Sequence, residues 1–212
     1  MLLINKGKPP NSLISYRKEK YAYFDGCNKE DIRQALLKEQ GNLCAYCMRR
    51  IDITNMKIEH WYPENLMDDN GCLEYNNMLA CCVGHNEGDS GKYDTCDTHK
   101  KDTVIYIDPR NSEHINQIQY RSKDGTIYSD NDCFNKDLDI VLNLNSETHY
   151  LKQNRKEALD SFKQFMIKRK ISGQWNENML KKVLNEYDTK DENGERKEYS
   201  GIILWYIKRK LK

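Results

Sequence analysis

The sequence predicts an α+β fold with a small core framed by cysteines, a short β-hairpin and a C-terminal helical region. Four cysteines frame residues 44–96, short β-prone runs bounded by turn residues continue to residue 128, and apolar residues recur at helix period after residue 148. We therefore expect three parts: an N-terminal arm and helix at 1–43, a core with the cysteine frame and hairpin at 44–147, and a basic helical region at 148–212.

The composition is that of a folded protein without a membrane segment. Hydrophobic residues make up 38% of the 212 and charged residues 32%, but 14 Tyr and 3 Trp argue against disorder. The longest apolar run, residues 202–207, is far below the roughly 18–20 residues of a membrane span. The first residues lack the apolar core of a signal peptide. We expect a cytoplasmic protein with no membrane association.

Charge is divided unevenly along the chain. Residues 1–150 carry 18 Lys and Arg against 24 Asp and Glu, a net charge of −6, whereas residues 151–212 carry 16 against 9, a net charge of +7. An acidic half suits a divalent cation, and a basic tail suits a phosphate backbone or an acidic partner. The aromatic residues of the tail are typical of a packed helical core and not of exposed stacking platforms: Phe162, Phe165, Trp175 and Trp205. We therefore favour core packing and docking of a partner over nucleic-acid binding by the tail.

The N-terminal part contains one well-marked helix. Residues 4–10 suit a first strand or an extended arm. A helix is predicted over 29–40, because Asn28 is a good N-cap and Gly41 a good stop.

The core is predicted to alternate short strands with loops. Strands at 50–53 and 57–59 flank the turn-prone pair Thr54-Asn55. The segments that follow are expected in this order: a polar loop at 63–71, a helix or tight turn at 76–81, a loop at 84–95 and a short helix at 96–101.

The second half begins with β structure and ends with helices. A strand is expected at 103–107, and 117–121 and 126–128 form a hairpin around Lys123-Asp124-Gly125. The helical segments are expected at 135–142, from residue 148 onward, at 175–187 and at 199–211, with a solvated linker at 190–195.

Four cysteines have a spacing that suits structural zinc. Such a site takes four ligands in a tetrahedron, often from two C-x2-4-C knuckles. Cys44 and Cys47 form one knuckle, and Cys82 and Cys96 form a second one with a long loop inserted. The closed site would hold the core together without an open position for chemistry.

The sequence alone does not decide which residue is the third zinc ligand. Cys81 competes with Cys82, and His85 could replace either of them. The alternative is that Cys44 and Cys47 are ordinary buried thiols that bind no metal, but their C-x2-C spacing favours zinc.

The pair Glu59-His60 suits metal-assisted hydrolysis of a phosphodiester. Such a reaction needs an activated water and a divalent cation that neutralises charge on the phosphate. A neutral His, with an ordinary pKa of about 6.5, is a suitable base. Side chains alternate across a regular strand, so we expect a twist before Pro63 to bring Glu59 and His60 into one cleft.

Three further residues complete the predicted site. Asn77 is expected to fix the loop that carries His60 through bonds from its side chain to the backbone. The last metal ligand is Asp97 or His99, which lie about 200° apart around a helix. Asp suits Mg²⁺, whereas His suits Ni²⁺, Zn²⁺ or Mn²⁺, and the residue types alone leave the choice open.

Together these residues resemble the motif of the HNH endonuclease superfamily. The matching residues are Cys44, Cys47, Glu59, His60, Pro63, Asn77, Met78, Cys82 and the run 96–100. The resemblance implies a zinc-stapled ββα-metal nuclease core with a structural Zn²⁺, a catalytic Mg²⁺ or Mn²⁺, and Asp97 as the last ligand. The Asp at this position and the loop inserted before Cys96 depart from the family's pattern.

Longer segments resemble the PtuB-type HNH effector of Septu and retron anti-phage systems. They are residues 36–50, 56–61 and 142–145, together with the basic tail. The resemblance implies anti-phage defence, a partner ATPase of the PtuA type and, in the retron-linked form, a reverse transcriptase with its RNA–DNA product. It favours DNA as the substrate and leaves RNA, including tRNA, open.

A competing hypothesis is a zinc-dependent nucleic-acid-binding module without catalysis, which would bind through the basic tail. The intact set of Glu59, His60 and Asn77 argues against it. We therefore favour a metal-dependent endonuclease.

Overall fold

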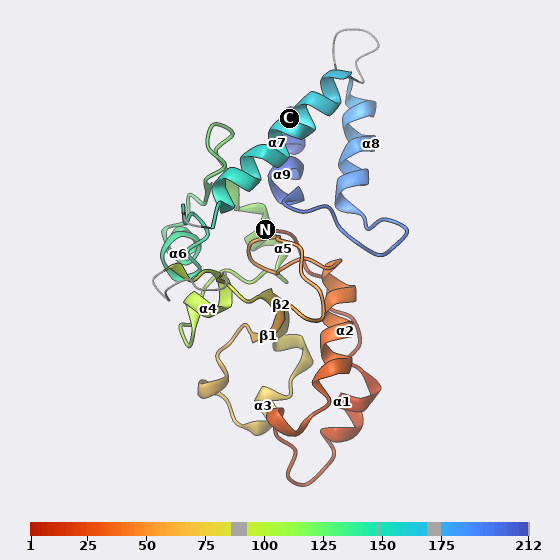
Figure 1. The fold of residues 1–212 in the computed structure, drawn as a ribbon, viewed down its shortest axis with the longest axis vertical. Coiled ribbons are helices and arrows are strands. Elements are labelled where there is room, and N and C mark those ends of the chain that lie inside the picture. Colours follow the sequence, from red (N-terminus) through yellow and green to blue (C-terminus); the bar gives the residue numbers. More distant parts are fainter. Residues whose placement is uncertain (86–92, 148, 169–174, 212) are drawn as a thin grey trace.

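Two antiparallel strands, β1 (Met56–His60) and β2 (Met78–Cys82), lie near the middle of the elongated molecule, between two groups of helices (Figure 1). The helices within residues 11–72 lie toward one end of the molecule, and those within residues 151–210 lie toward the other. The computed structural model describes residues 1–85, 93–147, 149–168 and 175–211. Its mixture of helices with two small sheets agrees with the predicted α+β class.

The helices and strands of the described residues follow one another in this order: α1 Asn11–Tyr16, α2 Lys29–Gln40, β1 Met56–His60, α3 Asp69–Cys72, β2 Met78–Cys82, α4 Cys96–Lys100, α5 Ser112–Asn116, β3 Gln119–Tyr120, β4 Ile127–Tyr128, α6 Asp132–Lys136, α7 Leu151–Lys168, α8 Glu177–Asp188 and α9 Ser200–Lys210. Short 3-10 turns lie at Phe24–Gly26, Glu64–Leu66 and Tyr75–Asn77, and a π-helical turn at Asp137–Val141 follows α6.

Helix α2 forms where the sequence predicted it and supports the central sheet. The Asn28 side chain accepts from the N–H groups of Glu30 and Asp31, and Gly41 ends the helix in the left-handed conformation. Near the end of the helix, the Gln40 amide bonds both the N–H and the C=O of Ala80 in β2, at 2.8 Å each. The buried amide therefore fixes the helix against the sheet.

The partner of β1 differs from the prediction. Strand β1 pairs with β2 from Met56↔Cys82 to His60↔Met78, so residues 78–82 form a strand and not the helix or tight turn expected at 76–81. The strand expected at 50–53 is absent, and this region contributes one isolated bridge, Leu43↔Arg50. Every residue of β2 is buried, so its sequence carries no alternation that separates a strand from a helix.

Two other expectations about local structure were wrong. Residues 103–107 form no strand, because the N–H groups of Tyr106 and Ile107 bond the Asp137 carboxylate in place of a neighbouring strand. The polar loop at 63–71 contains a 3-10 turn and α3. Residues 4–10 form an extended arm, with the Ile4 N–H bonded to the Pro109 carbonyl. Most of the loop predicted at 84–95 lies outside the described residues.

The C-terminal helices pack as the aromatic residues suggested. Phe162 of α7 makes edge-on contacts with Tyr187 of α8 and Tyr206 of α9, and Trp175 contacts Tyr206. The β3–β4 hairpin forms around Gly125 and packs on α7 through a bond of 2.6 Å from Arg155 Nε to the Gly125 carbonyl. No described helix combines the length and apolar character of a membrane span.

Candidate active site

Four thiols come together from three elements of the chain. Cys44 and Cys47 lie in the turn after α2, Cys82 ends β2 and Cys96 begins α4. Their Sγ atoms all lie within 4.8 Å of one another, and Cys44–Cys96 and Cys47–Cys82 are each 3.8 Å apart. A tetrahedron with zinc–sulfur bonds of about 2.3 Å has edges of about 3.8 Å, so the cluster fits a zinc ion.

The structure places Cys82, and not Cys81, in the thiol cluster. Neighbouring residues of a strand point to opposite faces, so only one of the two can point directly at the metal. His85 lies apart from the cluster, with its Nδ1 atom 3.8 Å from the Asp94 carboxylate. The knuckle itself is closed by a bond of 3.1 Å from the Met48 N–H to the Cys44 carbonyl.

Two arginines lie near the thiols and supply positive charge. Burial lowers the pKa of Arg49, but the charges of Cys47 and Cys82 raise it more, so that the pKa lies above its ordinary value. Arg155 of α7 is fully buried, and its guanidinium donates to the carbonyls of Gly125 and Leu144. A zinc ion held by four thiolates would carry a net charge of 2−, which these two cations would offset.

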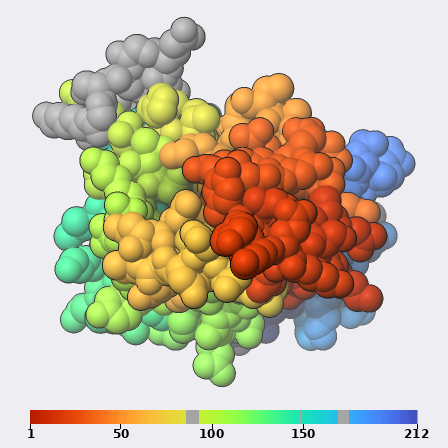
Figure 2. Space-filling model, turned by 90° about the horizontal axis from the view of Figure 1, so that it is seen from below, coloured from red at the N-terminus to blue at the C-terminus, as the bar shows by residue number. Residues whose placement is uncertain are grey.

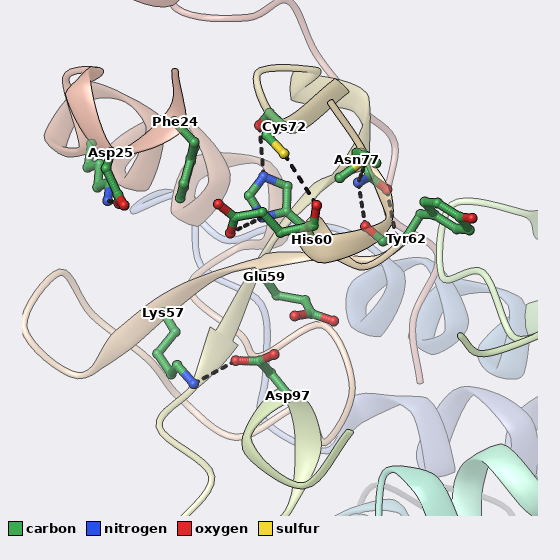
Figure 3. A network of polar contacts seen from close by, with 12 residues as sticks. Phe24, Asp25, Lys57, Glu59, His60, Tyr62, Cys72, Asn77 and Asp97 are labelled. Carbon is green, nitrogen blue, oxygen red and sulfur yellow. Dashed lines mark hydrogen bonds and ion pairs between the residues drawn. The ribbon is translucent and has the colours of Figure 1, made fainter. Parts of the chain in front are cut away.

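A pair of carboxylates lies beside the cluster, because Asp97 follows Cys96 directly in α4. Figure 3 shows the carboxylates of Glu59 and Asp97 facing each other on one side of β1. Burial raises the pKa of Glu59 well above its ordinary value, and hydrogen bonding and repulsion from Asp97 raise it further. The pKa of Asp97 is lowered, because hydrogen bonds from Glu59 and Lys57 outweigh its own burial.

Three donors that sequence reasoning had not assigned surround this carboxylate pair. Lys100 Nζ lies 2.8 Å from Glu59 Oε1 although the lysine is buried, and Lys57 Nζ lies 2.8 Å from Asp97 Oδ2. The Tyr46 hydroxyl donates to Glu59 Oε1 over 2.9 Å. The only sequence signals for these residues were the lysine of the C-x3-K run and the inner position of the C-x2-C knuckle.

His60 lies on the opposite side of β1 from Glu59 (Figure 3). The strand keeps its register with β2 through His60, so the expected twist does not bring both side chains into one cleft. The ring packs edge-on against Phe24, with His60 Nε2 2.8 Å from the Cys72 carbonyl and Nδ1 3.5 Å from Glu64. Because a carbonyl only accepts, Nε2 carries the proton and Nδ1 is the basic atom of the neutral ring. Burial lowers the pKa of His60.

Asn77 holds the chain that follows His60. Its Oδ1 accepts from the Tyr62 N–H and its Nδ2 donates to the Tyr62 carbonyl, both at 2.9 Å. Its own carbonyl accepts from the Trp61 N–H. The two bonds to Tyr62 have the side-chain to backbone form that the sequence predicted for Asn77.

The structure separates the two candidates for the last ligand. Asp97 faces Glu59, whereas His99 Nδ1 lies 2.9 Å from the Val141 carbonyl in the π-helical turn. The arrangement therefore offers a pair of carboxylates on one side of β1, a neutral imidazole on the other side, and a four-thiol cluster that joins the turn after α2 to β2 and α4.

A comparison with known proteins finds a related HNH protein. Over 83 residues the chain is 32% identical to a protein of Vibrio cholerae serotype O1 biovar El Tor described as "Retron Vc95 putative HNH endonuclease". The match covers 38% of this chain and 38% of that protein's length. No family model matches the chain. The similarity supports the resemblance to the HNH superfamily.

Proposed function

We propose that this chain is a metal-dependent endonuclease of the HNH type, which hydrolyses phosphodiester bonds in nucleic acid. The observation that carries the proposal is the junction of Cys96 and Asp97, where a member of the thiol cluster is followed directly by a carboxylate that faces Glu59. A structural zinc site thus lies next to a pair of hard oxygen donors.

His60 is the proposed general base. Its neutral ring takes a proton from the attacking water at Nδ1, while the Cys72 carbonyl holds Nε2–H and fixes the orientation of the ring. The lowered pKa of His60 keeps the imidazole neutral near pH 7. Asn77 acts as a positioning residue, because it fixes the backbone two residues beyond the base.

Glu59 and Asp97 are the proposed ligands of a divalent cation, Mg²⁺ or Mn²⁺. The fit rests on their chemistry: both offer carboxylate oxygens, and the ammonium groups of Lys100 and Lys57 already lie on those oxygens at 2.8 Å. When bound, the cation neutralises charge on the scissile phosphate and on the leaving oxygen. His99 is not proposed as a ligand, since its ring bonds the backbone elsewhere.

The similarity to the retron Vc95 protein supports a defence-system setting for this proposal. We place the chain as the effector of an anti-phage system of the retron or Septu type, controlled by a PtuA-type ATPase and, in a retron, by a reverse transcriptase with its RNA–DNA product. DNA is the favoured substrate and RNA, including tRNA, is the alternative. The exposed lysines of the C-terminal helices offer an acidic partner a docking face.

A cleavage assay with matched histidine variants tests this proposal. Wild type, His60→Ala and His85→Ala are each incubated with supercoiled plasmid and with tRNA, with the partner ATPase present, in Mg²⁺, Mn²⁺ or EDTA. We expect His60→Ala to cleave about 10²–10⁴-fold more slowly, as for loss of a general base. The His85→Ala control should cleave like wild type, because His85 lies outside the cluster.

Metal content is measured on the same preparations. All three proteins should retain zinc and differ only in cleavage. If wild type and His60→Ala nick both substrates equally, or if wild type cleaves equally well in EDTA, the proposed function is wrong.

A further inference from the structure

The segment 16–29, here called the aromatic turn, joins α1 to α2 and is rich in aromatic and basic residues. Four of its residues are Lys or Arg and two are Asp or Glu, a net charge of +2 within a half of the chain whose net charge is −6. Tyr21 is 79% exposed and Tyr23 52% exposed. Two aromatic rings within three residues are thus open to solvent in one turn.

The aromatic turn is held in one shape by its own hydrogen bonds. The Glu19 N–H bonds the Tyr16 carbonyl at 2.9 Å, and the Gly26 N–H bonds the Tyr23 carbonyl at 3.1 Å. A Cβ atom at Gly26 would lie 2.3 Å from the Tyr16 hydroxyl and 3.1 Å from the Tyr23 ring, so glycine permits this close packing. The exposed rings are therefore presented by an ordered turn.

The aromatic turn lies directly against the proposed general base. The Phe24 and His60 rings contact edge-on with centroids 4.6 Å apart, and Arg17 forms an ion pair of 2.9 Å with Glu74. Figure 2 shows this end of the molecule, where the red N-terminal residues lie against the orange and yellow residues around and after β1. Through Phe24, the aromatic turn thus packs on the same residue that the proposed function makes the general base.

Two cations of the turn are available to a ligand. Arg17 and Lys29 are engaged by Glu74 and Asp25, whereas Lys18 and Lys20 form no ion pair within the part of the chain that the structure describes. Lys20 Nζ lies 5.1 Å from the centre of the Tyr21 ring. Positive charge and an aromatic face are therefore presented side by side.

We propose that the aromatic turn binds single-stranded nucleic acid, with unpaired bases stacked on Tyr21 and Tyr23 and phosphates at Lys18 and Lys20. This inference rests on the proposed function and gives its substrate a class, a strand with unpaired bases beside the scissile bond. Stacking needs a free base face, which a continuous duplex does not offer, and every base has such a face. The positive charge complements the phosphate backbone.

Binding measurements on cleavage-deficient protein test this inference. In the His60→Ala background, without divalent cations, fluorescence anisotropy measures Kd for labelled single-stranded DNA, single-stranded RNA and duplex DNA of about 20 nucleotides or base pairs. The variants are Tyr21→Ala with Tyr23→Ala, and Tyr21→Phe with Tyr23→Phe, which keeps the rings. The matched control is Tyr150→Ala, since Tyr150 is 62% exposed and lies in the C-terminal half.

We expect the paired alanine variant to bind either single strand at least about tenfold more weakly, because each stacked base contributes about 5- to 150-fold. Duplex binding, the phenylalanine pair and the Tyr150→Ala control should stay within about twofold of the parent. Equal loss for single strands and duplex, or no loss at all, would overturn the inference. Cleavage by wild type reports separately on the proposed function: if wild type cleaves while the tyrosine pair does not affect binding, only the present inference fails.

Discussion

At Asp137 one buried carboxylate accepts the N–H groups of Tyr106 and Ile107, at 2.5 and 2.9 Å. These bonds replace the strand partner that the β-branched run at 103–107 would otherwise need. Burial raises the pKa of Asp137 above its ordinary value of 3.8, although the two N–H groups oppose the shift. Asp137 therefore orders residues 103–107, and the free-energy cost of burying its carboxylate depends on pH.

We predict that Asp137→Asn changes the pH dependence of stability. Between the unfolded pKa and the raised folded pKa, the folded protein binds more protons than the unfolded chain, so the free energy of unfolding of wild type falls as pH rises through that window. The amide keeps an acceptor for both N–H groups and does not ionise. Its stability relative to wild type should therefore be more favourable at about pH 7 than at about pH 3 in urea unfolding.

Asp137→Ala serves as the matched control for this prediction. It removes the acceptor, and the buried N–H group of Ile107 left unpaired should cost about 1–3 kcal/mol. The part-buried N–H group of Tyr106 should cost less, because water can reach it. An Asp137→Asn variant whose relative stability decreased from low to neutral pH would contradict the argument.

At the scale of single residues, the residue types indicated which chemistry the site could perform, but they did not indicate where each side chain lies. Glu59 and His60 were identified by their neighbours in the sequence, but their separation across β1 depends on whether the strand stays regular at its end. Lys100 was visible only as a lysine of the motif. Its burial against Glu59 results from packing of α4 on β2, which no local pattern specifies.

Among the elements, those with local end signals were predictable. Asn28 and Gly41 bound α2 through contacts within a few residues, so the helix was predicted over its observed range. Strand β2 has no such signals. Its identity depends on pairing with β1, which precedes it by a long connection, and its fully buried, apolar sequence suits a helix equally well.

A matched pair of cysteine variants tests the staple that joins these elements. We predict that Cys82→Ser loses most of the bound zinc, from about one ion per chain, because a ligand of the tetrahedron is removed. The Cys81→Ser control, one residue away, should keep its zinc, because its thiol lies outside the cluster. Metal analysis after dialysis measures zinc, and thermal unfolding measures the accompanying loss of stability.

The reverse result, with zinc lost from Cys81→Ser and kept by Cys82→Ser, would show that β2 turns its other face to the metal. Loss from both variants would mean that the second buried thiol is needed to shape the site.

Across the whole molecule, the C-terminal helices pack against the turn that carries Cys44 and Cys47. The Tyr199 N–H bonds the Met48 carbonyl, and a Cβ atom at Gly201 would lie 2.7 Å from Met48 Sδ. The positively charged side chain of Arg155 in α7 lies near the thiols, and its Nε donates to the Gly125 carbonyl of the hairpin. One continuous hydrophobic cluster includes Met1, Cys47 and Ile202, so the parts predicted as separate segments share a core.

We predict that Gly125→Ala strongly destabilises the protein, whereas Gly194→Ala has a small effect. Both glycines have positive φ, +76° and +78°, so both substitutions carry a similar conformational cost of about 1 kcal/mol. A Cβ atom at Gly125 would lie 2.1 Å from the Lys152 carbonyl of α7, whereas nothing lies within 4 Å at Gly194. The clash should add about 1–3 kcal/mol or more. Equal losses in urea unfolding would contradict close packing of the hairpin on α7.

The Cys96–Asp97 junction also determines when, during synthesis, the proposed nuclease could first become complete. A growing chain presents Cys44, Cys47 and Glu59 early, but the last thiol and the second carboxylate leave the ribosome together, nearly 40 residues later. At the usual rate of about 5–20 residues per second, the chain passes several seconds with neither centre complete. The proposed nuclease therefore stays incomplete until Asp97 has left the ribosome, and a partner would have that interval to assemble before cleavage could begin.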